Sequence, residues 1–76
     1  MNGPDKRYAR NIEQGKQRRL HILRDLADNY SLQQAAERDG MSYSTAKYHL
    51  MILREMSGCS HIGGVIGWAF RNKLVE

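Results

Sequence analysis

Residues 31–55 read SLQQAAERDGMSYSTAKYHLMILRE, and this stretch decides the fold of the chain. Ser31 can cap a helix with Gln34 as its capping-box partner, because each side chain can accept a hydrogen bond from the backbone N–H of the other residue. Gly40 can take the left-handed conformation that ends a helix, and Ser42 can cap the helix that follows. The stretch therefore predicts a helix, a tight turn and a second helix.

The two predicted helices span residues 32–39 and 43–56. In the later one, Ala46, Leu50 and Leu53 recur at i, i+4 and i+7, which marks a buried face. The residues outside that stripe are mostly polar or aromatic. A helix with such an outer face after a tight turn is how helix-turn-helix proteins place side chains in the major groove of DNA. An ordinary helical bundle whose polar faces only contact water would show a similar pattern.

Two further helices are expected, at residues 16–29 and 61–72. Gly15 interrupts the pattern before the first of them, so residues 1–15 are interpreted as a tail or a short extra helix. β-Branched residues never alternate over a useful run, so no strand is expected. The predicted fold class is all-α: a four-helix helix-turn-helix domain, residues 16–76, with a basic N-terminal tail or short extra helix.

The last predicted helix contains three glycines, each of which costs about 1 kcal/mol relative to alanine. Gly63 and Gly67 leave a bare strip on which another backbone could lie, and an exposed Trp68 beside it suggests a contact between two copies. Ser60 is expected to cap this helix, and a loop around Gly63–Gly64 is the alternative. Its core side is expected to comprise Ile62, Val65, Ile66, Ala69 and Phe70. The residues assigned to the dimer contact are Gly63, Gly64, Gly67, Trp68 and Arg71.

Composition and charge narrow the class of protein. A chain of 76 residues forms one small domain, and no stretch approaches the ~20 apolar residues of a membrane span. No signal peptide is visible, and a single cysteine cannot form an internal disulfide, so a cytoplasmic location is expected. The formal net charge is +4, and residues 1–24 carry seven Lys or Arg against two acidic residues. A basic start favours contact with phosphate, although many small soluble proteins are mildly basic.

Neither a metal site nor a catalytic site is expected. His21, His49, His61 and Cys59 invite a zinc interpretation, but the Cys59-x-His61 pair cannot close a tetrahedral site. Cys59 is expected to be a small core residue instead. The sequence has no glycine-rich phosphate loop and no nucleophile motif, so neither a cofactor nor an enzymatic activity is predicted.

Residues 16–75 resemble the DNA-binding domain of the LuxR/GerE type, a four-helix module with a central helix-turn-helix. The family commonly reads E-I-A-E-R-L-G-I-S-x-x-T-V-K-x-H-L, and residues 34–50 read QAAERDGMSYSTAKYHL without a gap. Gly58, Ser60 and the aliphatic pair Leu74–Val75 follow the downstream pattern of the family. The chain departs from the family where bulky tyrosines, a smaller core alanine and two aspartates replace the usual residues.

The resemblance implies a transcription regulator that binds double-stranded DNA as a homodimer, with the fourth helix as the dimer contact. Lys47 matches a position that typically contacts DNA, Thr45 lies near the backbone in this family, and His49 matches a position often close to a phosphate. Tyr43, Ser44 and Tyr48 fall where the family reads its target. Arg18 and Arg19, at the start of a helix, are added as candidate phosphate contacts. Arg54, one to two turns beyond Lys47, is added as well, although it could instead pair with Glu55 or Asp39. The full set of candidate DNA-binding residues is Tyr43, Ser44, Thr45, Lys47, Tyr48, His49, Arg54, Arg18 and Arg19.

Two other interpretations stay open. The domain could be a protein-interaction module that binds a regulator or an RNA polymerase subunit through Trp68, Met51 and Ile52. Within DNA binding, a domain like region four of a sigma factor shares the same core and does not need a dimer.

Overall fold

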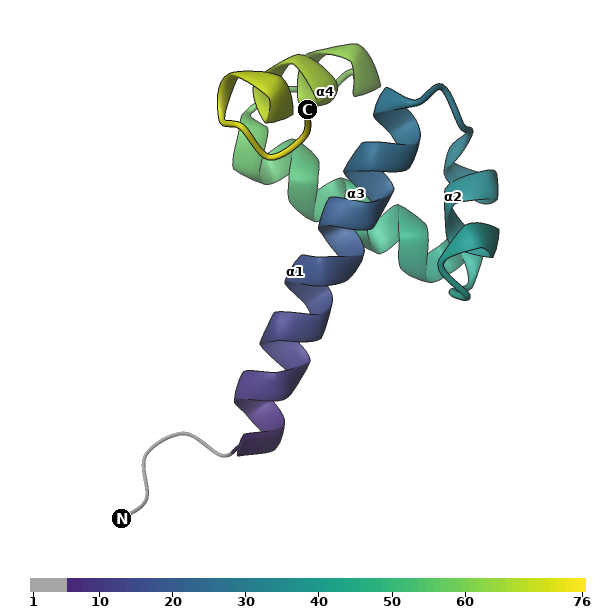
Figure 1. Cartoon of the computed structure of the whole chain (residues 1–76), viewed down its shortest axis with the longest axis vertical. Coiled ribbons are helices and arrows are strands. Elements are labelled where there is room, and N and C mark those ends of the chain that lie inside the picture. Colours follow the sequence, from purple (N-terminus) through teal and green to yellow (C-terminus); the bar gives the residue numbers. More distant parts are fainter. Residues whose placement is uncertain (1–5) are drawn as a thin grey trace.

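The computed structural model consists of four helices and the turns that join them (Figure 1). It describes residues 6–76, with side chains described from residue 14 onward, and over this range it contains no strand. The predicted all-α, four-helix class is confirmed. None of the described helices is long and apolar enough to cross a membrane. The helices are α1 (Lys6–Ala27), α2 (Leu32–Arg38), α3 (Tyr43–Ser57) and α4 (Ile62–Arg71).

Helix α1 is one continuous helix of 22 residues, and the predicted interruption at Gly15 is wrong. A single internal glycine costs about 1 kcal/mol, which the good helix formers Gln14, Lys16 and Gln17 around it can offset. The first half of α1 extends beyond the body formed by the rest of the chain (Figure 1). The structure does not describe residues 1–5 or the side chains of residues 6–13. The remaining part of the predicted N-terminal tail or short extra helix lies in these residues.

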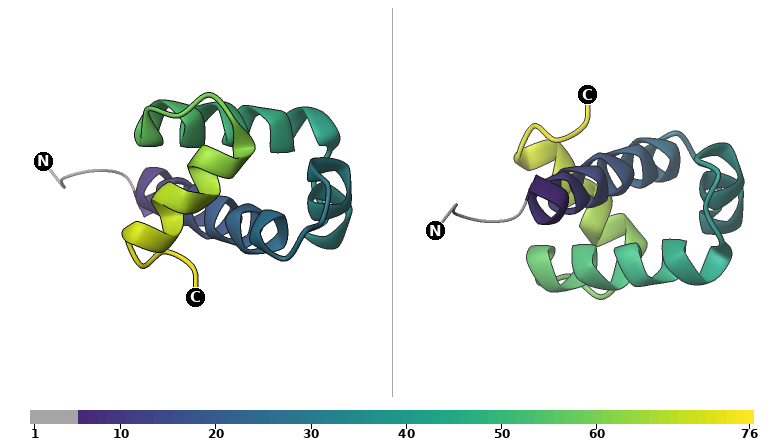
Figure 2. Two further views of the ribbon diagram at one scale, coloured as in Figure 1. Left: turned by 90° about the horizontal axis from the view of Figure 1, so that it is seen from above. Right: turned by 90° about the horizontal axis from the view of Figure 1, so that it is seen from below.

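Helices α1 and α3 form the centre of the fold. Each contacts the other and also contacts both α2 and α4, whereas these two shorter helices do not touch each other. Seen from above and from below, α2 and α4 lie at different ends of α3 (Figure 2). The turn between α2 and α3 is therefore remote from α4, the helix for which the sequence predicts the dimer contact.

The core between the helices is small and aliphatic. Ile22, Leu23, Leu53 and Val65 are its largest fully buried side chains, contributed by α1, α3 and α4. The predicted buried stripe of α3 is confirmed. The whole cluster comprises Ile22, Leu23, Leu26, Ala36, Ala46, Leu50, Leu53, Val65, Ala69 and Val75.

A left-handed residue closes the turn between α2 and α3, as predicted. Gly40 has φ of 66°, and the backbone N–H of Met41 donates to the carbonyl of Ala36 at 2.9 Å. This pairing satisfies a carbonyl that the end of a helix would otherwise leave free. The same kind of turn follows α1 and α4, where Asn29 and Lys73 adopt φ of 75° and 58°.

Side-chain caps fix the starts of α2 and α3. Ser31 and Gln34 form the predicted capping box: the Gln34 N–H donates to Ser31 Oγ at 3.1 Å, and the Ser31 N–H donates to Gln34 Oε1 at 2.9 Å. Ser42 Oγ accepts from the N–H of Thr45 at 3.1 Å and starts α3. Both predicted caps are therefore confirmed, and together with the glycine turn they set the angle at which α3 leaves α2.

Candidate nucleic-acid interface

The outer side of α3 carries a row of exposed side chains. Ser44, Lys47, Tyr48 and Met51 are exposed and follow one another at i, i+3, i+4 and i+7, so they form one ridge along the helix. We call these four residues the α3 ridge. It is out of phase with the buried stripe of α3, and packing of that stripe against the other helices therefore holds the ridge toward solvent.

The positive charges of α3 form no ion pair with the side chains that the structure describes. Lys47 Nζ lies 5.1 Å from the centre of the Tyr43 ring, a cation–π arrangement that leaves the charge un-neutralised. Arg54 is exposed and pairs with neither Glu55 nor Asp39. Over the described side chains the ion pairs are those between α1 and the end of α2, so neither cation of α3 takes part in one.

Thr45 is part of the cap that begins α3. Its hydroxyl accepts a hydrogen bond from Ser42 Oγ at 2.9 Å, and its side chain is half-buried. This hydrogen bond holds Thr45 at the turn before α3. The residue at the matching position of the LuxR/GerE family is expected near the DNA backbone.

His49 lies inside the protein, which argues against the direct phosphate contact expected of it. The residue is 6% exposed, because it shares the inward side of α3 with the aliphatic stripe. Its Nδ1 lies 3.4 Å from Arg19 Nη1, and its ring centre is 5.9 Å from that of Tyr48. Burial lowers the pKa of His49, and the charges of Arg19 and Arg18 lower it further. We therefore assign His49 a structural role, that of supporting neighbouring side chains.

The two arginines of α1 have different environments. Arg18 is exposed, whereas Arg19 is half-buried and directs its guanidinium to His49 of α3. Arg19 thus links the two central helices. Arg18 keeps the surface position that a phosphate contact needs.

A polar network that the sequence did not reveal joins α1 to the end of α2. Arg38 Nε donates to Asp25 Oδ1 at 3.3 Å, and its guanidinium lies 4.2 Å above the Tyr30 ring. His21 Nδ1 lies 3.0 Å from Asp39 Oδ1, while the second carboxylate oxygen of Asp39 is buried without a partner. The two aspartates that depart from the family pattern therefore hold α2 against α1 through polar contacts.

The predicted core side of α4 is confirmed for Val65 and Ala69, which are buried, and for Ile66, which packs against the core cluster, but not for the rest of the helix. Trp68 was expected to be exposed, but it is half-buried and packs against the core cluster. Ile62 and Phe70, which were assigned to the core side, are 37% and 46% exposed. Ser60 does not cap α4, because the helix starts one residue later than expected, after His61, which makes no side-chain cap bond. Apolar residues on nearly every side of α4 make its rotation difficult to predict from periodicity.

The glycines of α4 do not form a uniformly open strip. A methyl group added to Gly63 would meet nothing within 4 Å, so this position is free for a partner. One added to Gly64 would lie 3.1 Å from Cys59 Cβ, because Cys59 packs against the helix there. The surface of Gly67 is approached by Arg71 Nη1, 3.3 Å from the added carbon. Gly64 therefore packs against Cys59 within the fold, which disfavours a close approach by a partner there, and its assignment to a dimer contact stays a prediction.

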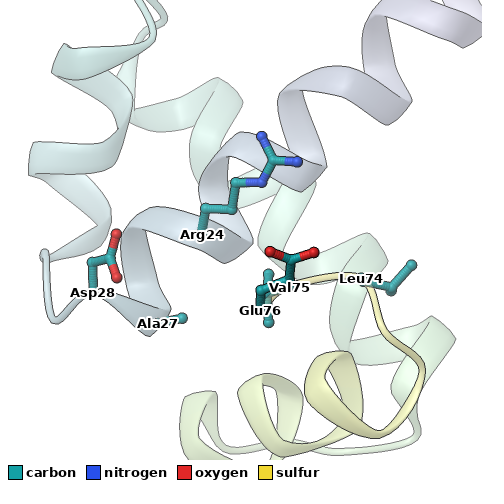
Figure 3. A pocket seen from close by; sticks show the side chains of 6 residues that line it. All are labelled: Arg24, Ala27, Asp28, Leu74, Val75 and Glu76. Carbon is teal, nitrogen blue, oxygen red and sulfur yellow. The ribbon is translucent and has the colours of Figure 1, made fainter.

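A pocket of about 340 Å³ lies between the end of α1 and the C-terminal segment, residues 72–76 (Figure 3). Arg24 lines it from α1, Asp28 from the turn that follows α1, and Glu76 from the end of the chain. The charges are of both signs, so the lining does not select a ligand of one charge. Within the described residues, no group of three or more His, Cys, Asp or Glu gathers in a way that could hold a metal ion.

Comparisons with known proteins give no information about the function, which is therefore argued from the residues. No protein-family model matches the chain, and neither the curated proteins nor the solved structures contain a match. The resemblance to the LuxR/GerE type therefore rests on the sequence motifs described above.

Proposed function

We propose that this chain is a sequence-specific, dimeric DNA-binding regulator of transcription, with α3 as the recognition helix. The observation that carries the proposal is the capped α2–turn–α3 unit, from which the α3 ridge projects into solvent. A ridge held by packing on the inner side of its helix is the geometry that a side chain needs to reach base edges in the major groove.

The distribution of charge supports contact with a polyanion. Lys47 and Arg54 on α3 and Arg18 on α1 are exposed and form no ion pair among the described side chains. Phosphate contact at these cations would release counterions without first breaking a salt bridge of the protein. We therefore assign affinity to these three residues and selectivity to the other residues of the ridge.

The dimer contact is proposed for α4, with a surface different from the one expected from sequence. Ile62 and Phe70 expose apolar surface, and Gly63 leaves room for a close approach. Because α4 does not touch α2, pairing through α4 would leave the start of α3 free. A two-fold dimer of this kind would recognise inverted half-sites.

A protein-interaction module is the second candidate function, and an apolar groove favours it. The groove has a volume of about 230 Å³ and lies between α1, the end of α3 and the C-terminal segment. Of the contact residues predicted for a regulator or RNA polymerase subunit, Met51 is exposed, whereas Trp68 and Ile52 are half-buried. The groove is lined by Lys16, Arg19, Leu20, Leu23, Leu53, Met56 and Leu74.

Selection of bound duplexes from a random DNA pool, followed by sequencing, tests the proposal. An enriched inverted repeat is expected for the wild-type protein. Lys47→Glu should lose binding, whereas Lys73→Glu, which makes the same charge change just beyond α4, should largely retain it. Failure to enrich any sequence with a folded protein would overturn the proposal and favour the protein-interaction module.

Sedimentation of the protein with and without an enriched duplex tests the dimer separately. Phe70→Lys should weaken self-association and leave the fold intact, because Phe70 is 46% exposed. A protein that binds its enriched site strictly as a monomer would contradict the dimer and favour a domain like region four of a sigma factor.

A further inference from the structure

The chemistry of the α3 ridge restricts the bases that it can recognise. In the major groove, adenine is typically bound through two hydrogen bonds by Asn or Gln, cytosine donates to Asp or Glu, and guanine accepts from Arg or Lys. The ridge contains none of the amides or carboxylates in this set, and its one cation is Lys47. Its two large side chains are Tyr48 and Met51, which are 56% and 47% exposed. Apolar surface of this kind matches the 5-methyl group of thymine, the apolar feature that a thymine presents in the major groove.

Neighbouring side chains leave the ring of Tyr48 available. Lys47 directs its ammonium group to the ring of Tyr43 and so engages a different tyrosine. The ring contact of Tyr48 is with His49, at 5.9 Å between centroids and an interplanar angle of 60°. His49 is 6% exposed, so the ring that Tyr48 contacts is held within the fold. Tyr48 therefore presents ring surface to solvent while it contacts a buried neighbour, which suits contact with a small apolar group.

We propose that Tyr48 recognises the 5-methyl group of a thymine in each half-site. This inference rests on the proposed function, since it needs α3 to lie in the major groove. It adds that thymine is the base that the ridge selects and that the 5-methyl group is the feature by which thymine is recognised. The tyrosine hydroxyl is not required, because a methyl group is recognised by apolar contact.

The test replaces thymine by uracil, which differs from it by this methyl group. Each thymine of the duplex enriched by selection is replaced singly, and affinity is measured by fluorescence anisotropy at fixed salt. At one thymine in each half-site, uracil should weaken binding about threefold to fivefold, as expected for one methyl group left in water. Elsewhere in the site, uracil should bind like thymine.

Variants of Tyr48 connect the effect to the residue. Tyr48→Phe should keep the preference for thymine, whereas Tyr48→Ser should bind thymine and uracil duplexes equally. Met56→Ala is the matched control, because Met56 is also 56% exposed but lies eight residues, or about 12 Å, further along α3. This control should keep the wild-type preference. Helical circular dichroism checks that each variant is folded.

The outcomes separate this inference from the function on which it rests. An enriched sequence at which uracil is tolerated everywhere, or a thymine preference that Tyr48→Ser retains, overturns the methyl readout and leaves DNA recognition intact. If selection enriches no sequence, the proposed function itself fails before any uracil is introduced, and the methyl readout fails with it.

Discussion

Two adjacent glycines of α4 should respond differently to the same substitution. Replacing either by alanine restricts the unfolded chain and favours the helix, which is worth about 0.5–1 kcal/mol. At Gly63 the added methyl group meets nothing within 4 Å, so the full gain should appear. At Gly64 it lies 3.1 Å from Cys59 Cβ and 3.3 Å from Cys59 Sγ. Cys59 is held in place, since its N–H donates to Ser57 Oγ at 3.1 Å.

Overpacking of this kind typically costs about 1–3 kcal/mol, which exceeds the gain in helix propensity. Gly63→Ala should therefore raise the melting temperature by roughly 2–8 °C, whereas Gly64→Ala should leave it unchanged or lower it. Thermal unfolding followed by circular dichroism, at a concentration where the protein is monomeric, measures both. Equal stabilisation by the two substitutions would refute the packing of Cys59 on α4. If Gly63 also lies in a dimer contact, Gly63→Ala should weaken self-association while it stabilises the monomer.

Three further substitutions test other parts of the fold. Burial lowers the pKa of His49 below its ordinary 6.5, so the unfolded chain binds more protons than the folded chain as pH falls below that value, and stability decreases. In His49→Leu the urea midpoint should therefore fall less between about pH 7 and about pH 5 than in wild type. An equal fall of the midpoint in the two proteins would contradict the burial of His49. Leu53→Ala should cost about 2–5 kcal/mol in urea unfolding, because Leu53 is 2% exposed; a loss below about 1 kcal/mol would contradict its place in the core. Ser31→Ala should cost about 1 kcal/mol through loss of the capping box, and a thermal melt equal to that of wild type would show that the cap adds nothing.

The α2–turn–α3 unit could be predicted from sequence because its signals are local. A cap such as Ser31 with Gln34, or a left-handed turn at Gly40, depends on residues within one helical turn, and the structure confirms both. The burial of His49 also had a local signal. It completes an i, i+3, i+4, i+7 pattern with the aliphatic stripe of α3, but the polarity of the imidazole and its family counterpart favoured a surface role.

The parts that could not be predicted depend on packing between distant segments. The contacts of Asp25 with Arg38 and of His21 with Asp39 join residues 13 and 18 positions apart, so no local pattern reveals them. The rotation of α4 is selected by which side chains fit against α1 and α3. DNA binding, the dimer and the roles assigned to the α3 ridge stay predictions, which the experiments above address.

The lack of contact between α2 and α4 makes the two ends of the molecule energetically separable. Substitutions at distant sites that share no partners have nearly additive effects on stability. Changes in the polar network at the end of α2 should therefore combine additively with changes on the exposed side of α4. Such a molecule can acquire a new target at one end and a new mode of assembly at the other in independent evolutionary steps, provided that the central pair α1 and α3 is preserved.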